Sequence, residues 1–153
     1  MRYTTPRTHY LRIADAVFIP GRNGDSFRLV NGVATFNSGT DSLLSAPMYL
    51  PDGATVTSVE FVFADTSASA DVTARLLRKT PDATLAEPLL VSATSSGDSG
   101  EQTILDTTIT SPVVDNQAYH YYLLASIPGG ETWKFSATTI KRVLITYRVE
   151  ETE

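Results

Sequence analysis

Cysteine is missing from the 153-residue sequence, and its absence removes three kinds of chemistry. Without thiols the chain has no disulfide, no thiolate nucleophile and no zinc site of the Cys type. The two histidines, His9 and His120, lie far apart in the sequence. Because a Walker loop and a Gly-x-Gly-x-x-Gly turn between a strand and a helix are missing too, we expect no cofactor.

Clustered positive charge is also scarce. The chain has 12 Lys and Arg residues against 17 Asp and Glu residues, for a formal net charge of −5. The basic residues form only short clusters, within residues 75–79 and 134–142. A nucleic-acid-binding surface normally needs a basic patch or stripe, so we expect no nucleic-acid partner.

Long apolar runs are absent. No run approaches the length of a membrane span, and residues 1–6 are not followed by the apolar core of a secretion signal. We therefore expect a soluble protein without a membrane span, either cytoplasmic or exported by a dedicated route.

Helical periodicity is missing as well, and strand periodicity takes its place. Thr and Ser together make up close to a quarter of the residues, and Val, Ile, Tyr and Phe are frequent, a composition that favours strands. Apolar residues alternate with others in residues 54–64, 72–76, 119–127 and 143–149. Half-buried strands produce this pattern because successive side chains point to opposite faces of a sheet.

Turn signals separate these runs. Residues 23–24 and 31–32 (both Asn-Gly) favour hairpin turns, because both residue types accept a positive φ. Residues 51–53 (Pro-Asp-Gly) and 128–130 (Pro-Gly-Gly) predict tight turns. Residues 92–100 form the most loop-like stretch.

The segments bounded in this way predict about eight to ten strands. We therefore predict an all-β fold, a two-sheet antiparallel β-sandwich of the jelly-roll type with essentially no helix. No internal repeat or shift in composition marks a boundary. Residues 1–153 are expected to form one domain, with a short N-terminal arm of about residues 1–8 and an acidic C-terminal tail at residues 150–153.

One string of residues imitates a catalytic motif. Residues 97–100 (Gly-Asp-Ser-Gly) are the types that surround the nucleophile of trypsin-like proteases, but Glu101 follows where those enzymes have Gly. Neither His9 nor His120 lies in the Ala-Ala-His context of those enzymes, and Ser99 would need such a base. We interpret the string as a surface turn and predict a protein that is not an enzyme, with an unrecognised hydrolase as the alternative.

Two acidic residues are candidates for a calcium site. Asp65 and Asp71 flank residues 66–70 and could share an ion with backbone carbonyls. The spacing of a dedicated calcium loop is missing, so we predict no metal and keep these two residues as the candidates.

Trp133 is the sole tryptophan and follows a Gly-Gly turn. An aromatic ring near the end of a sheet can serve as a platform for a sugar, which makes Trp133 the candidate ligand-binding residue. The alternative is a residue at the rim of the core that packs against it.

The segment at residues 119–127 is apolar on both faces. If its odd-numbered residues face the core, His120, Tyr122 and Leu124 lie on the opposite face, and Leu144 repeats the feature near the C-terminus. Exposed apolar patches usually mark interfaces, and aromatic residues are favoured at interface centres. We therefore predict a homo-oligomer, with a trimer favoured. The alternative is that a segment of the same chain covers this face.

Several stretches together resemble a known group of proteins. Residues 50–57 contain a Leu-Pro-x-Gly-Ala turn that leads into residues 59–78, residues 114–127 contain the aromatic strand, and residues 145–149 close the chain. This arrangement, over residues 48–149, is similar to uncharacterised bacterial β-sandwich domains. More loosely, it resembles the jelly rolls of tumour necrosis factor and of the complement globular heads. That resemblance implies trimers that bind partners through surface loops.

Three functions are consistent with these observations. The first is a non-catalytic jelly-roll module that self-associates and binds a protein partner through surface loops. The second is a carbohydrate-binding module centred on Trp133, with a glycan as the ligand. The third is a structural component of a phage or bacterial particle.

Overall fold

The computed structural model describes residues 4–20, 26–30, 33–38, 43–82, 87–127 and 138–152. The one helical element in these residues is the 3-10 turn η1 (Asp15–Val17), and no helix among them is long and apolar enough to cross a membrane. The all-β prediction is therefore confirmed. The strands of the described residues are β1 (Thr4–Ala14), β2 (Ile19–Pro20), β3 (Ser26–Val30), β4 (Val33–Ser38), β5 (Leu44–Met48), β6 (Thr55–Asp65), β7 (Thr73–Lys79), β8 (Glu87–Thr94), β9 (Gly100–Asp106), β10 (His120–Ser126) and β11 (Thr138–Thr152).

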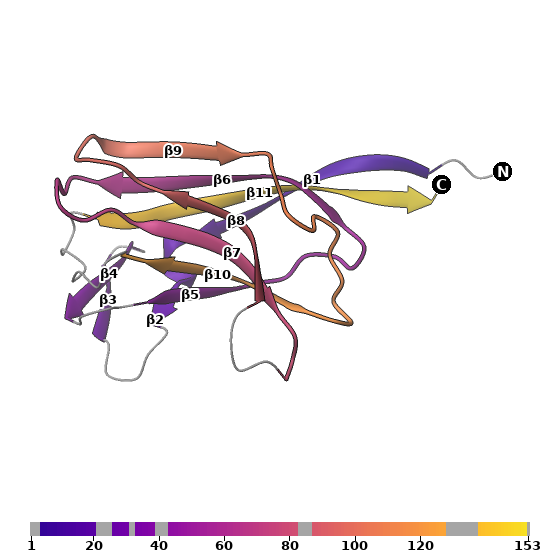
Figure 1. The fold of residues 1–153 in the computed structure, drawn as a ribbon, viewed down its shortest axis with the longest axis horizontal. Coiled ribbons are helices and arrows are strands. Elements are labelled where there is room, and N and C mark those ends of the chain that lie inside the picture. The colour runs from indigo at the N-terminus through magenta and orange to yellow at the C-terminus, as the bar shows by residue number, and fades with distance from the viewer. Residues whose placement is uncertain are drawn as a thin grey trace.

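The strands form two layers, as Figure 1 shows. A four-stranded sheet has the order β1-β11-β6-β9, and a five-stranded sheet has the order β2-β5-β10-β7-β8. All paired strands are antiparallel. If the two-residue strand β2 and the hairpin β3–β4 are set aside, the remaining strands, numbered along the chain, have the order 1-8-3-6 in one sheet and 2-7-4-5 in the other. This is the strand order of a jelly roll.

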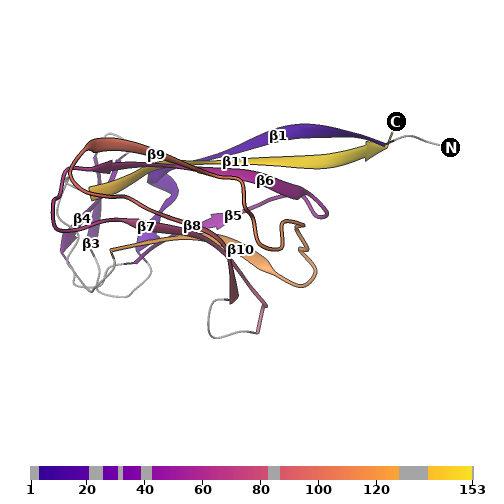
Figure 2. The ribbon, with the colours of Figure 1, turned by 45° about the horizontal axis from the view of Figure 1, so that its top comes forward.

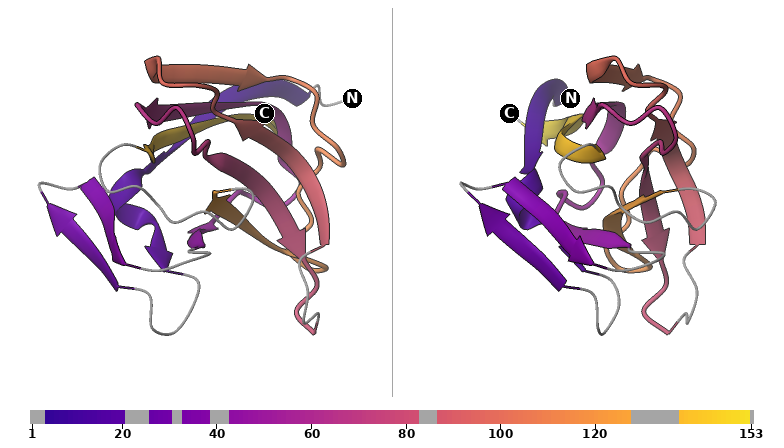
Figure 3. Two further views of the ribbon diagram at one scale, coloured as in Figure 1. Left: turned by 60° about the vertical axis from the view of Figure 1, so that its left-hand side comes forward. Right: turned by 90° about the vertical axis from the view of Figure 1, so that its left-hand side faces the viewer.

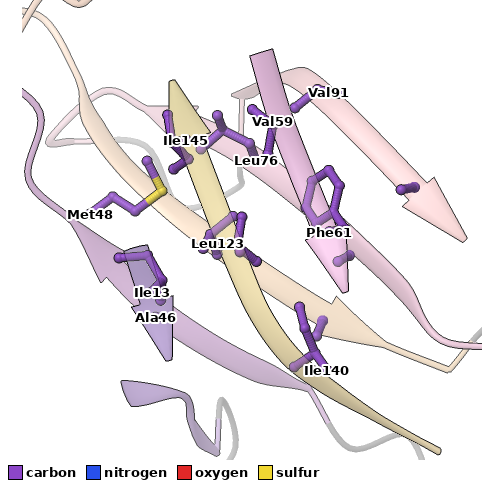
Figure 4. Close-up of a cluster of buried hydrophobic side chains, with 14 of the residues drawn as sticks. Ile13, Ala46, Met48, Val59, Phe61, Leu76, Val91, Leu123, Ile140 and Ile145 are labelled. Carbon is purple, nitrogen blue, oxygen red and sulfur yellow. The ribbon is translucent and has the colours of Figure 1, made fainter. Parts of the chain in front are cut away.

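The core lies between the two sheets and is filled by every second residue of the long strands. In β10 the inward row is Tyr121, Leu123 and Ala125, all buried, as the alternation in residues 119–127 predicted. Figure 4 shows side chains from both sheets pointing into the same space. One face of each sheet is thus used for the core, and the other face of each sheet points away from it.

Two irregularities in the β6–β11 ladder keep the core-facing residues of the two strands opposite one another. The register skips one residue between Ile140 and Arg142, and a second shift lies between Thr146 and Tyr147. The second shift leaves Thr57 without a partner in the ladder, and the Thr57 Oγ1 donates a hydrogen bond to the Thr146 carbonyl at 3.1 Å. β-bulges of this kind change which face a side chain occupies without breaking the sheet.

The predicted turns within the described residues have mixed outcomes. Pro51, Asp52 and Gly53 form the expected tight turn, with Gly53 at φ 74° and an Ala54 N–H donated to the Pro51 carbonyl at 3.1 Å. Residues 95–99 form the loop predicted within residues 92–100, whereas the two ends of that stretch belong to strands, because β8 continues to Thr94 and β9 begins at Gly100. The Asn-Gly turns and residues 128–130 lie outside the described residues.

The segments expected as an arm and a tail pair with each other. Thr4 aligns with Thr152 and Pro6 with Glu150 in the β1–β11 ladder, so the described residues of both segments belong to strands. Figures 1 and 2 show the paired ends projecting beyond the rest of the sandwich. The hairpin β3–β4, visible in Figure 3, lies beside η1, with which β4 makes contact.

The packing of the core yields a prediction about stability. Phe61 is fully buried, so Phe61→Ala should lower the free energy of unfolding by about 3–5 kcal/mol. Leu105→Ala, at a residue 60% exposed on β9, is the control and should change it by about 0.5 kcal/mol or less. Urea unfolding followed by circular dichroism measures both values. Equal effects of the two substitutions would contradict the described burial.

Candidate functional site

A groove of about 610 Å³ opens on the outer face of the five-stranded sheet. Its lining comes from strands β2, β5, β7 and β10 and from the residue that follows β5. The residues whose side chains give the groove its apolar, aromatic and basic surfaces are Ile19, Pro47, Tyr49, Lys79, His120 and Tyr122.

The alternation of β5 and β10 explains why these side chains point outward. In β5 the residues Leu44, Ala46 and Met48 are buried, so Pro47 and the next odd residue, Tyr49, are exposed. In β10 the even residues point away from the core, and the register places Tyr122 beside Pro47. The groove is therefore built on sheet positions whose direction is fixed by the core on the other side.

Among the described residues, Tyr49 is the most exposed large hydrophobic residue, with 84% of its area accessible to solvent. The backbone behind it is anchored, because Leu50 is buried and its carbonyl accepts a hydrogen bond from Asn116 Nδ2 at 2.8 Å. The Asp52 carboxylate accepts the Asn116 backbone N–H at 2.8 Å. An exposed aromatic ring on an anchored backbone can receive a ligand with little loss of conformational entropy.

Tyr122 supplies the second aromatic ring of the groove and is half-buried. Burial raises the pKa of Tyr122 above its ordinary value, because desolvation disfavours the phenolate. The hydroxyl is therefore protonated at neutral pH and can both donate and accept a hydrogen bond.

One end of the groove carries nitrogen donors. Lys79 and His120 are register partners on neighbouring strands, so their side chains leave the same face about 5 Å apart at Cβ. Farther along this face, Arg75 Nη1 donates a hydrogen bond to Ser126 Oγ at 3.1 Å. No carboxylate is among the residues that line the groove.

The residues predicted for an oligomer interface are divided between the two outer faces. His120, Tyr122 and Leu124 lie on the outer face of β10, where the first is exposed and the other two are half-buried. Leu144 lies on the outer face of β11, in the four-stranded sheet on the other side of the core. The structure thus brings the first three together and leaves Leu144 apart from them.

The residues that sequence reasoning missed are Ile19, Pro47, Tyr49 and Lys79. A signal for Tyr49 was present, because the alternating Leu44, Ala46, Met48 and Leu50 assign an outward position to the aromatic residue between the last two. Trp133, chosen instead as the sugar platform, lies outside the described residues.

Asp65, a calcium candidate, is a fully buried carboxylate whose two oxygens both accept hydrogen bonds. Oδ1 accepts the Ser67 backbone N–H at 3.0 Å, and Oδ2 accepts the Ser95 hydroxyl at 2.5 Å. The Ser95 hydroxyl oxygen in turn accepts the Val72 N–H at 2.8 Å. Asp71, the other candidate, is half-buried, and within the described residues no three His, Cys, Asp or Glu side chains are grouped to hold a metal. The hydrogen bonds of Asp65 thus join the end of β6 to the segment that follows it and to the segment that follows β8.

Ser99 lies exposed in the turn between β8 and β9, where Gly97 and Gly100 take positive φ. Neither histidine serves it as a base. The His9 ring stacks on Tyr147 at 5.6 Å between centroids, and His120 lines the groove at the far end of β10. The arrangement that a serine nucleophile requires is therefore not formed by these residues.

The solved structures with a similar fold include several carbohydrate-binding modules. The xylan-binding module CBM15 has 15% sequence identity and a TM-score of 0.56, with 92% of this chain and 97% of that chain covered. The C-terminal CBM6 of LamC, a marine laminarinase from Zobellia galactanivorans, has 16% identity and a TM-score of 0.54, with 90% and 99% covered. CBM86, a low-affinity xylan-binding module from Roseburia intestinalis, has 15% identity and a TM-score of 0.50, with 95% and 96% covered.

At this level of identity the likeness shows the fold alone. No protein-family model matches the chain, and no curated protein matches it in sequence. The structures named above agree with the predicted β-sandwich fold, and they give no support to the looser resemblance to tumour necrosis factor.

The buried carboxylate yields a second prediction. Asp65→Ala should lower the free energy of unfolding by about 3 kcal/mol, because it removes hydrogen bonds to a charged group and leaves the Ser67 N–H unpaired. Asp98→Ala, at an exposed residue of the β8–β9 turn, is the matched control and should have little effect. Millimolar Ca²⁺ should leave the melting temperature of the wild-type protein unchanged. A calcium-dependent rise that Asp65→Ala abolishes would instead establish a metal site there.

Proposed function

We propose that this protein is a non-catalytic carbohydrate-binding module whose ligand lies in the groove on the outer face of the five-stranded sheet. The observation that carries the proposal is the exposed Tyr49 ring beside the half-buried Tyr122 in that groove. A sugar ring has apolar C–H faces that pack on aromatic rings, and hydroxyls at its edge that need polar partners. Tyrosine provides both surfaces in one side chain.

The comparisons support the same class of function. The named neighbours span nearly the whole chain and are carbohydrate-binding modules, and two of them bind xylan. Because fold by itself does not determine function, the proposal depends on the groove, and the neighbours only indicate which polysaccharides to test first.

The lining of the groove favours binding over cleavage. Hydrolysis of a glycosidic bond by the usual route needs two carboxyl groups on either side of the bond, and no carboxylate lines this groove. A ligand held by Tyr49, Tyr122 and the nitrogen donors would therefore be retained intact.

A groove and an oligomer interface cannot both use this face. His120 and Tyr122, which the sequence assigned to self-association, line the groove, and a second copy seated on them would close it. The hollow shape and exposed aromatic ring favour the ligand, so a solution mass of one chain together with glycan binding is the expected result.

The proposal predicts that Tyr49→Ala weakens glycan binding by roughly tenfold or more, the effect of losing the contact area of one aromatic side chain. Tyr49→Phe should retain most of the affinity, because the ring remains. Affinity gel electrophoresis with xylan, laminarin and polygalacturonate, followed by calorimetry on the polymer that retards the protein, measures the change.

Tyr10 provides the matched control for this experiment. It is 67% exposed on β1 of the other sheet, so Tyr10→Ala removes the same side chain from the opposite side of the molecule. Equal losses of affinity in the two variants would place the binding site elsewhere.

A further inference from the structure

We infer that the groove selects acidic glycans, those that carry carboxylate or sulfate groups, over neutral ones. The inference rests on the proposed function and extends it to the chemical class of the ligand. It comes from the distribution of charge over the two outer faces, which the overall composition does not reveal.

Charge is segregated on the five-stranded sheet. The chain has an excess of acidic residues, with a net charge of −5. Yet the outward positions of strands β5, β7 and β10 carry Arg75, Lys79 and His120 and no carboxylate. The nearest acidic residue along the chain from Lys79 is Asp82, in the exposed turn that follows β7. The described outward positions of these three strands therefore carry basic residues, although the molecule as a whole is acidic.

The other outer face shows the contrast. The four-stranded sheet carries charges of both signs, and there Lys141 Nζ contacts the Glu101 carboxylate at 2.7 Å. Lys141 lowers the pKa of Glu101, first through this hydrogen bond and then through its charge. Among the described residues, neither Lys79 nor His120 forms such an ion pair.

The positions of the donors match a sugar that carries an acidic substituent. Tyr49 follows β5, and its neighbour Met48 pairs with Tyr121, so the ring lies on the side of His120 away from Lys79. A sugar stacked on Tyr49 would direct a substituent toward the imidazole and the ammonium. The bonds from Lys79 to a carboxylate or sulfate are charge-assisted, and such bonds are stronger than neutral ones.

Nucleic acid is the other common polyanion, but the site does not suit it. Its binding depends on many phosphate contacts along a positively charged track, whereas the described lining of the groove contains one Lys and no Arg. Single-stranded DNA is therefore included in the test as a competitor class.

The test compares pairs of polymers that share a backbone and differ in whether the acidic group is charged or has been blocked or removed. Affinity of the intact chain is measured by calorimetry for polygalacturonate and for its fully methyl-esterified form, and for a sulfated galactan and its desulfated form. The acidic member of at least one pair should bind about fivefold or more tightly at low salt, and this preference should shrink as salt rises because charge is screened. The pair that shows the preference tells whether the groove takes carboxylate or sulfate.

Two substitutions assign the preference to the groove. Lys79→Met should reduce affinity for the acidic polymer by roughly fivefold and leave affinity for its neutral form nearly unchanged. Lys141→Met makes the same change in net charge on the other sheet and should leave both affinities unchanged. Circular dichroism verifies that each variant is folded.

The outcomes separate this inference from the proposed function. Equal affinity for charged and neutral forms, or equal effects of the two lysine substitutions, would overturn the preference while the carbohydrate-binding function stands. Tighter binding to single-stranded oligothymidylate than to any glycan would overturn both. Failure to bind any polymer of the panel would also overturn both.

Discussion

The antiparallel pairing of β6 with β11 is the constraint on which the rest of the sandwich depends. β11 also pairs with β1 and β6 with β9, so this one ladder holds the whole four-stranded sheet in register. Val59 faces Ile145 and Phe61 faces Val143, and all four are fully buried. A slip of one residue would turn this row to solvent, and the two register shifts in the ladder preserve it. The opposite sheet is then placed by the need to cover the same row.

The outer faces of the two sheets differ in the side chains that they carry. On the four-stranded sheet the outer face is a mixture of charged, small and isolated apolar side chains, which is typical of a surface in contact with water. On the five-stranded sheet, residues from β2, β5, β7 and β10 together border a groove with two aromatic rings. Concave sites with a few polar groups are where small ligands usually bind, which is why function is sought on this face.

The support behind the groove is as informative as its lining. Tyr121, beside Tyr122, is buried in the core, and its hydroxyl accepts the Asp115 N–H at 2.9 Å. Asn116 in the same loop bonds to the segment that carries Tyr49. The strand that supplies one ring and the turn behind the other are thus joined by a short set of hydrogen bonds. A site supported in this way keeps its geometry when the ligand is absent, which reduces the entropy lost on binding.

Alternation along the chain determined the fold class, the main strands and the two faces of β10, because the direction of a side chain in a strand follows from local geometry alone. The groove could not be predicted in the same way. Tyr49, Lys79 and His120 belong to three segments far apart in the sequence, and only the non-local register of β5, β10 and β7 makes them neighbours. Composition drew attention to Trp133, which lies outside the described residues, and exposure together with strand order adds Tyr49 as a candidate. The sequence by itself determined which residues face outward, and the tertiary structure alone decided which of them meet, because strand pairing depends on contacts that no local pattern encodes.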